Sequence, residues 1–153
     1  MKLLILIAAL IVFCSPPLPA VSTAAADDIS AGEVRQDVEK TLDLWRDGRY
    51  EEVYSRVIAG SHTKEYFISH LASAPRRPAC CWEKLQEVRV SRRDEWRATL
   101  HGKLGLDAGT GIEFMTRQLK LEKDGEVWKM TMSDVLALAG TGKKVRGGKK
   151  KRP

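Results

Sequence analysis

Few side chains in this sequence could carry acid–base chemistry, and their spacing limits what each can do. His62 and His70 are eight residues apart, so they miss the four-residue spacing with which two histidines on one helix hold zinc. Tyr66 and His70 do lie four residues apart, so on a helix they share one face and could hydrogen-bond into a pocket. The alternative is that both are ordinary, partly exposed side chains.

Two aspartates and the remaining histidine are weaker candidates. Asp43 and Asp47 lie on either side of Trp45 and could reach the mouth of a pocket, but the neighbouring Arg46 favours surface charge pairs. His101 alternates onto the polar face of a predicted strand, where it is exposed to solvent or faces a partner. None of the three defines a catalytic centre, and no metal site or cofactor is predicted.

Cys80 and Cys81 are adjacent in the chain and follow a proline-bounded loop segment, residues 75–78. Neighbouring alpha carbons lie about 3.8 Å apart across a trans peptide, below the usual disulfide range of ~4.4 to 6.8 Å. The pair could therefore be two structural thiols, a vicinal disulfide, or partners in metal or intermolecular bonding, and these three interpretations stay open.

The C-terminus is a separate, strongly basic segment. Residues 143–153 contain no acidic residue and one apolar residue, so we expect a disordered tail. Its partners would be polyanions such as an anionic lipid or a cell-envelope polymer, although a solvated, solubilising tail is the alternative. Seven side chains carry its charge: Lys143, Lys144, Arg146, Lys149, Lys150, Lys151 and Arg152.

The rest of the chain is not basic. Without Lys2 and the seven tail residues, 18 of the 26 basic residues remain against all 20 acidic ones. A strongly basic folded domain, the usual mark of nucleic-acid binding, is thereby excluded. We expect no nucleic-acid partner.

The N-terminus has the organisation of a secretory signal peptide. Lys2 precedes an apolar run over residues 3–13, and a proline-rich break and an Ala-x-Ala site ending at Ala26 follow. The run is shorter than the roughly 20 residues of a membrane span. We therefore expect residues 1–26 to be cleaved and the protein to be exported, to the periplasm. Lipoprotein anchoring through Cys14 is disfavoured, because Phe13 occupies the place of the small residue that such signals require.

Three helices are predicted in the first half of the single domain, residues 27–142. A capping box at residues 30–33 begins the first, whose apolar stripe ends at Gly48. The second extends over residues 50–60 and the third over residues 63–73.

The second half alternates with the period of strands, over residues 84–92, 96–107, 112–123 and 126–132. Trp96 and Leu100 share the inward face of the second of these, and a bulge is expected between Phe114 and Leu119, where the alternation slips. Ser133 is expected to cap a short last helix. We predict an α+β fold, with N-terminal helices packed on a strongly curved antiparallel sheet and a short C-terminal helix.

Two segments carry a resemblance to a known family, residues 45–54 (WRDGRYEEVY) and residues 124–130 (DGEVWKM). With the order of helices and strands, they resemble small exported members of the nuclear-transport-factor-2-like (cystatin-like) superfamily, over residues 30–139. The resemblance implies a cone-shaped fold that encloses a pocket. In that superfamily the pocket binds a small molecule, carries out isomerase, dehydratase or hydrolase chemistry, or is filled and serves as a scaffold.

Ten side chains are candidates for the lining of such a cone, where a small apolar ligand or a protein would bind. The alternative is that the aromatic members simply fill the core. The ten are Trp45, Tyr54, Tyr66, Phe67, His70, Trp96, Leu100, Phe114, Trp128 and Met130.

The leading hypothesis is an exported, non-catalytic domain of the cell envelope that binds a ligand or protein, because the inward strand face carries no titratable group. One alternative is a small pocket enzyme that uses Tyr66, His70 or an aspartate near the cone mouth. Another is a homodimeric interaction module that pairs through the outer sheet face around Thr99 and His101.

Overall fold

The computed structural model describes residues 23–141 of the 153-residue chain. The predicted leader as far as Ser22, including Cys14, and the predicted basic tail lie outside this range. The elements follow the order α1 (Thr23–Arg46), α2 (Tyr50–Ser55), β1 (Val57–Ile58), α3 (Lys64–Ala72), β2 (Arg77–Pro78), the 3₁₀ helix η1 (Cys81–Lys84), β3 (Leu85–Arg92), β4 (Arg97–Asp107), β5 (Ile112–Asp124), β6 (Val127–Thr131) and α4 (Met132–Ala139).

The predicted α+β class is confirmed, and the sheet is open and has six strands. Its order is β1-β6-β5-β4-β2, with β3 also paired to β4. All pairs are antiparallel except β1 with β6, which is parallel, so the expectation of a wholly antiparallel sheet is wrong. Val57 and Ile58 form β1 instead of ending the second helix, because that helix stops at Ser55 and β-branched residues favour an extended backbone.

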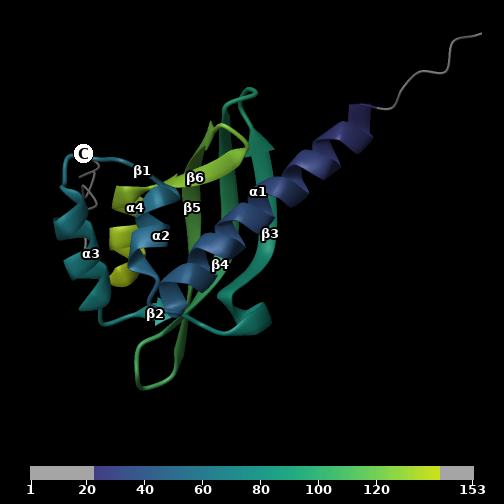
Figure 1. Cartoon of the computed structure of the whole chain (residues 1–153). Helices are drawn as coiled ribbons and strands as arrows, with labels where there is room; N and C mark the ends of the chain where they lie inside the picture. The colour runs from purple at the N-terminus through teal and green to yellow at the C-terminus, as the bar shows by residue number, and fades with distance from the viewer. Residues whose placement is uncertain (1–22, 142–153) are drawn as a thin grey trace, which may run out of the picture.

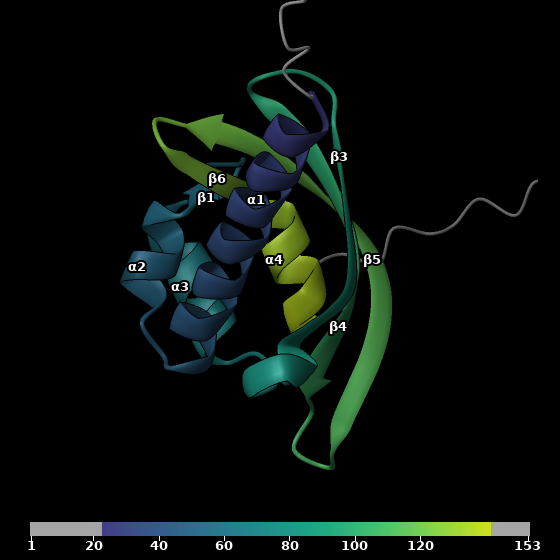
Figure 2. The ribbon, with the colours of Figure 1, turned by 90° about the vertical axis from the view of Figure 1, so that its right-hand side faces the viewer.

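The helices gather on one side of the sheet. α1 crosses the strands diagonally (Figure 1) and contacts β2, β3, β4 and β6. Turned by 90°, the molecule shows β4 and β5 bending around the helices, with α4 lying between α1 and β5 (Figure 2). This side of the sheet, called the inner face below, carries the buried residues of the strands.

The apolar stripe predicted on the first helix is confirmed, since Val34, Val38, Leu42 and Trp45 are each 0 or 1 % exposed. The predicted start of that helix is wrong. α1 begins at Thr23, so the proposed capping box at residues 30–33 lies within the helix. Three consecutive alanines precede it, and alanine has the highest helix propensity, which favours the longer helix.

No bulge interrupts β5, contrary to prediction. Its pairing with β4 continues without a shift from Arg97 opposite Glu122 to Asp107 opposite Ile112. The apolar residues change their spacing because they lie on opposite faces of the strand at its two ends. Leu119 is on the inner face, whereas Ile112 and Phe114 are on the outer face, 39 % and 44 % exposed.

Trp96 also departs from its predicted place in the core. It precedes β4, where its backbone N–H donates to the Asp94 carboxylate over 3.0 Å, and its side chain is 56 % exposed. The alternation of the strand predicts an inward side chain, but the turn before the strand directs the indole to solvent.

On the side of β4 away from β5, the chain pairs with β4 first as β2 and then as β3, and the residues between these two strands leave the sheet. Ala79 N–H donates to the carbonyl of Gly105 over 2.9 Å, and Leu85 is already paired with Leu104. Residues 80–84 are therefore extra chain, and we call them the excursion. The excursion lies over Gly105, where a Cβ would be 2.3 Å from the Glu83 carbonyl oxygen, so a larger residue at position 105 would displace it.

A single carboxylate connects α1 to two other parts of the fold. Asp37 Oδ1 accepts a 2.5 Å hydrogen bond from Arg56 Nη2, just after α2, and its Oδ2 accepts a 2.9 Å bond from the backbone N–H of Trp128 in β6. Arg56 Nε also donates to Thr41 Oγ1 over 3.3 Å. Both charged side chains are about one fifth exposed, so this ion pair is partly shielded from solvent.

We expect Asp37→Ala to lower the free energy of unfolding by about 2 to 3 kcal/mol, because it leaves a part-buried guanidinium and a backbone N–H without their acceptor. Urea denaturation would measure the loss. The matched control is Glu39→Ala on the same helix, which removes an exposed pair with Arg35 and should cost below about 0.5 kcal/mol. Equal losses in the two variants would contradict this account.

Candidate functional site

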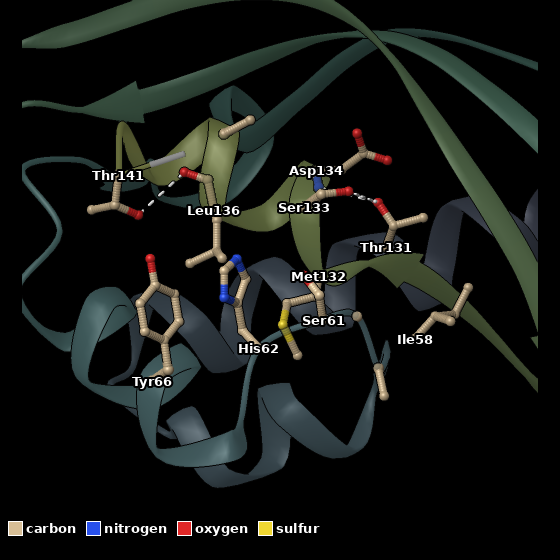
Figure 3. A pocket seen from close by; sticks show the side chains of 13 residues that line it. Ile58, Ser61, His62, Tyr66, Thr131, Met132, Ser133, Asp134, Leu136 and Thr141 are labelled. Atoms are coloured by element: carbon tan, nitrogen blue, oxygen red, sulfur yellow. Dashed lines mark hydrogen bonds between the residues drawn. The ribbon is translucent and has the colours of Figure 1, made fainter. Parts of the chain in front are cut away.

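An open cleft of about 690 Å³ lies between the loop that follows β1, helix α3 and helix α4. Figure 3 shows side chains from these three segments around it. Met132 and Leu136 of α4 form an apolar floor, being only 1 % and 5 % exposed. His62, Tyr66 and Thr141 contribute polar atoms to the walls.

Helix α3 places an aromatic stack on one wall of the cleft. Thr63 caps the helix by accepting a hydrogen bond from Tyr66 N–H, which confirms the predicted start of this helix. The Tyr66 ring lies between two imidazoles, with its centroid 4.2 Å from that of His62 and 3.7 Å from that of His70. The stack follows from the four-residue spacing, because residues 62, 66 and 70 share one side of the helix and its entry.

Helix α4 supplies the opposite wall. Thr131, rather than the predicted Ser133, caps it by accepting a 3.1 Å hydrogen bond from Asp134 N–H. The Ser133 hydroxyl lies 3.0 Å from that of Thr131. The helix ends at Ala139, Gly140 after it adopts the left-handed conformation, and Thr141 Oγ1 then donates to the Leu136 carbonyl over 3.3 Å.

The titratable side chains that line the cleft do not converge. They are His62, Tyr66 and Asp134. The Asp134 carboxylate accepts from Lys120 N–H in β5 over 3.4 Å, and Figure 3 shows it pointing away from the two rings. No hydrogen bond joins the side chains of any two of them within residues 23–141, so the cleft lacks an assembled acid–base pair.

Tyr66 and His70, which were expected to share one helix face, contact each other by stacking. His70 Nδ1 lies 2.8 Å from the Tyr66 backbone carbonyl and therefore donates to it. His70 is not among the residues that line the cleft. The described part of the chain also contains no group of three or more His, Cys, Asp or Glu side chains arranged to hold a metal ion.

The ten predicted cone-lining residues do not form one site. Five of them fill the core, are at most 1 % exposed and do not line the cleft: Trp45, Phe67, Leu100, Trp128 and Met130. Tyr54 packs on this core, its ring centroid 5.9 Å from that of Phe67. Trp96 and Phe114 are exposed elsewhere, and of the ten only Tyr66 lines the cleft.

Sequence reasoning missed the rest of the cleft. Residues 58–60 were expected to end the second helix, and Met132 was expected on the core face of the last strand. A usable signal was present in Thr131 and Asp134, whose spacing matches a threonine that caps a helix and an acid in its first turn.

The two aspartates beside Trp45 form surface pairs, as the neighbouring arginine indicates. Asp43 lies 3.0 Å from Arg46 and 2.6 Å from Lys84 Nζ, and Asp47 lies 3.1 Å from Arg46. Neither aspartate lines the cleft.

Cys80 and Cys81 are joined as a vicinal disulfide at the start of the excursion, with alpha carbons 3.7 Å apart. Both residues are exposed, and Trp82 beside them is 73 % exposed. This group is built on β2, η1 and β3, whereas the cleft is built on α3, α4 and the loop after β1.

Two surface ion pairs shift pKa values near turns. The side-chain hydrogen bond from Arg97 lowers the pKa of Asp94 at the β3–β4 turn. The side-chain hydrogen bond to Glu51 raises the pKa of Lys64, and this pair ties α2 to the first turn of α3. Both pairs are structural, since neither touches the cleft.

No protein-family model matches this chain, and no curated protein shows significant sequence similarity to it. None of the helices within residues 23–141 is both long and apolar enough to cross a membrane.

We expect the ring current of Tyr66 to shift the side-chain proton resonances of His62 and His70 upfield, because both imidazoles stack on its faces. Replacing Tyr66 by leucine should move both sets of resonances downfield in proton NMR spectra. Tyr54→Leu, which removes a tyrosine outside the stack, serves as the control and should leave them in place. Unchanged imidazole resonances in Tyr66→Leu would show that the stack does not form in solution.

Proposed function

We propose that this protein is an exported, non-catalytic binding domain of the cell envelope, and that a small apolar ligand occupies the cleft between α3 and α4. The observation that carries the proposal is the cleft itself, which combines an apolar floor with a polar rim. Ligand sites in proteins are typically concave and mostly apolar, with a few placed polar groups, and a volume of about 690 Å³ is within their usual range.

The chemistry of the walls indicates what the ligand would contain. Ile58 and Ala137, which line the cleft and are not fully buried, favour a hydrocarbon or aromatic group, and the stacked ring of Tyr66 offers a flat surface at the side. Hydroxyls of Ser61 and Ser133 lie at the rim, where they can hydrogen-bond to a polar end of the ligand. An amphipathic small molecule satisfies both requirements.

Binding is favoured over catalysis by the separation of the acid–base groups. A pocket enzyme needs a base or acid within hydrogen-bond reach of the reacting atom, and usually a second group that orients it. Asp134 is instead turned toward Lys120 of β5, while His62 is stacked on Tyr66.

The order of helices and curved strands supports a relationship to the cone-shaped, nuclear-transport-factor-2-like superfamily as part of this proposal. In this chain the interior between helices and sheet is occupied by Trp45 and Trp128, so the ligand site would have moved to the end of the cone, beside α4.

The basic tail has a defined place in the proposal. Thr141 lines the cleft, so the tail is attached at the rim, two residues before Lys143. A protein held at an anionic surface by its tail would thus keep the cleft close to that surface, where amphipathic molecules concentrate.

A bulky side chain in the cleft should block ligand entry. We expect Ala137→Trp to weaken binding of the apolar fluorescent probe 1-anilinonaphthalene-8-sulfonate by about tenfold or more, because Ala137 is exposed and lines the cleft. Fluorescence titration measures the affinity. The control Ala72→Trp adds the same side chain on an exposed residue of α3 that does not line the cleft. Equal affinities in both variants would refute the cleft as the binding site.

Removal of residues 143–153 should weaken binding to phosphatidylglycerol vesicles by at least about a hundredfold at low salt, since each of seven basic residues contributes on the order of 1 kcal/mol near an anionic surface. Vesicle co-sedimentation provides the measurement, and neutral phosphatidylcholine vesicles are the control. Binding of the intact chain should also fall as salt is added. Equal binding by both forms would end the role given to the tail.

A further inference from the structure

Strand β5 has a long free edge. It pairs with β4 over residues 112–122, but β6 covers only residues 121–124 on its other side. Residues 112–120 thus have no strand beside them on that side within the described chain. Figure 2 shows this part of β5 at the rim of the molecule.

Whether a residue of β5 has an odd or an even number tells which side of the strand its backbone N–H and C=O face. Lys123 N–H donates toward β4, to the Trp96 carbonyl over 2.8 Å, so the odd residues of β5 direct their backbone hydrogen bonds to β4. The even residues direct theirs outward. Lys120 N–H is accepted by Asp134, which leaves the edge open at Ile112, Phe114, Thr116 and Gln118.

The side chains along the edge have a self-complementary order. Glu113 and Arg117 lie on the inner face at equal distances on either side of Met115, and both are exposed. Arg117 makes no ion pair with another residue in the range 23–141. Glu113 is half exposed and has a 3.3 Å contact with Arg76, which leaves one side of its carboxylate free.

We propose that a second copy of this chain adds its β5 to this edge, antiparallel, about a two-fold axis at Met115. In that register Glu113 of each copy faces Arg117 of the other, so two ion pairs form by symmetry. Phe114 faces Thr116, an aromatic and β-branched pair of the kind that stabilises antiparallel strands.

Backbone geometry agrees with the same register. The pairing places each outward-directed even residue opposite another even residue, as a hydrogen-bonded pair requires. Met115, whose backbone bonds go to β4, meets its counterpart in a non-hydrogen-bonded pair. A shift of the axis by one residue, to Phe114 or Thr116, preserves the hydrogen bonds but removes the match between Glu113 and Arg117.

The outer face of the sheet is less suited to a second copy. Arg89 and His101 are paired neighbours there, and Lys103 and Lys120 lie on the same face. Lys103 is paired with Glu87 and Arg97 lies opposite Glu122, so this face carries mixed charges without the two-fold match of Glu113 and Arg117 on the β5 edge. The edge of β5 therefore replaces the surface around Thr99 and His101 as the predicted dimer contact.

Charge exchange tests both the contact and its register. Sedimentation equilibrium of the protein, Glu113→Arg and Arg117→Glu would be measured separately from about 1 μM to 1 mM. We expect the unchanged protein to dimerise and each single variant to dimerise about tenfold or more weakly, because two like-charge pairs replace two ion pairs. An equimolar mixture of the two variants should recover the original affinity, since the introduced arginine of one copy faces the introduced glutamate of the other only in the mixed dimer.

Glu126→Arg is the matched control, because it makes the same charge change in the exposed β5–β6 turn, away from the edge. It should dimerise like the unchanged protein, and circular dichroism would confirm that every variant is folded. A monomeric unchanged protein would overturn the proposal. Single variants that dimerise normally, or a mixture no tighter than its components, would overturn it as well.

Discussion

The carboxylate of Asp37 links the helical layer to the sheet, and the arrangement of the cleft depends on it. It accepts hydrogen bonds from Arg56, just after α2, and from the backbone of Trp128 in β6. Because these two points are held together, the chain that leaves α2 must turn beside β6, where Val57 pairs with Met130 as the parallel β1. The residues that follow β1 then lie against the start of α4. The Asp37–Arg56 ion pair thus ties together segments that lead into the cleft, although neither residue lines the cleft.

The buried core and the open cleft occupy different parts of the fold. The two buried tryptophans and Phe67 occupy the space between helices and sheet, as in the close-packed interior of an ordinary domain. The open cleft lies outside this packed core, at the junction of α3 and α4. The polar groups at that junction mainly satisfy helix ends, as Thr63 and Thr131 do.

Local signals predicted much of the fold because they act within a few residues. Gly125 and Gly140 adopt the left-handed backbone at the turn and helix end where the sequence places them. The sequence predictions failed where the structure of a segment depends on residues far away in the chain. Alternation alone cannot tell the inner from the outer face of β5 near Phe114, because the helices leave that end of the sheet uncovered. Likewise, Val57 and Ile58 have helical spacing, but a partner strand more than seventy residues away draws them into the sheet. The cleft unites three segments that no sequence motif connects.

The excursion at residues 80–84 affects how copies of this protein can associate. It breaks the edge of the sheet opposite to β5, and the left-handed Glu87 distorts the pairing of β3 that follows. Interrupted and distorted edges are poor templates for strand addition. At the remaining end of the sheet order, β1 contributes only two residues. Strand addition at one border of a sheet whose other borders are interrupted or short would stop at a closed pair, so growth into fibrils is disfavoured in a chain that carries exposed aromatic side chains.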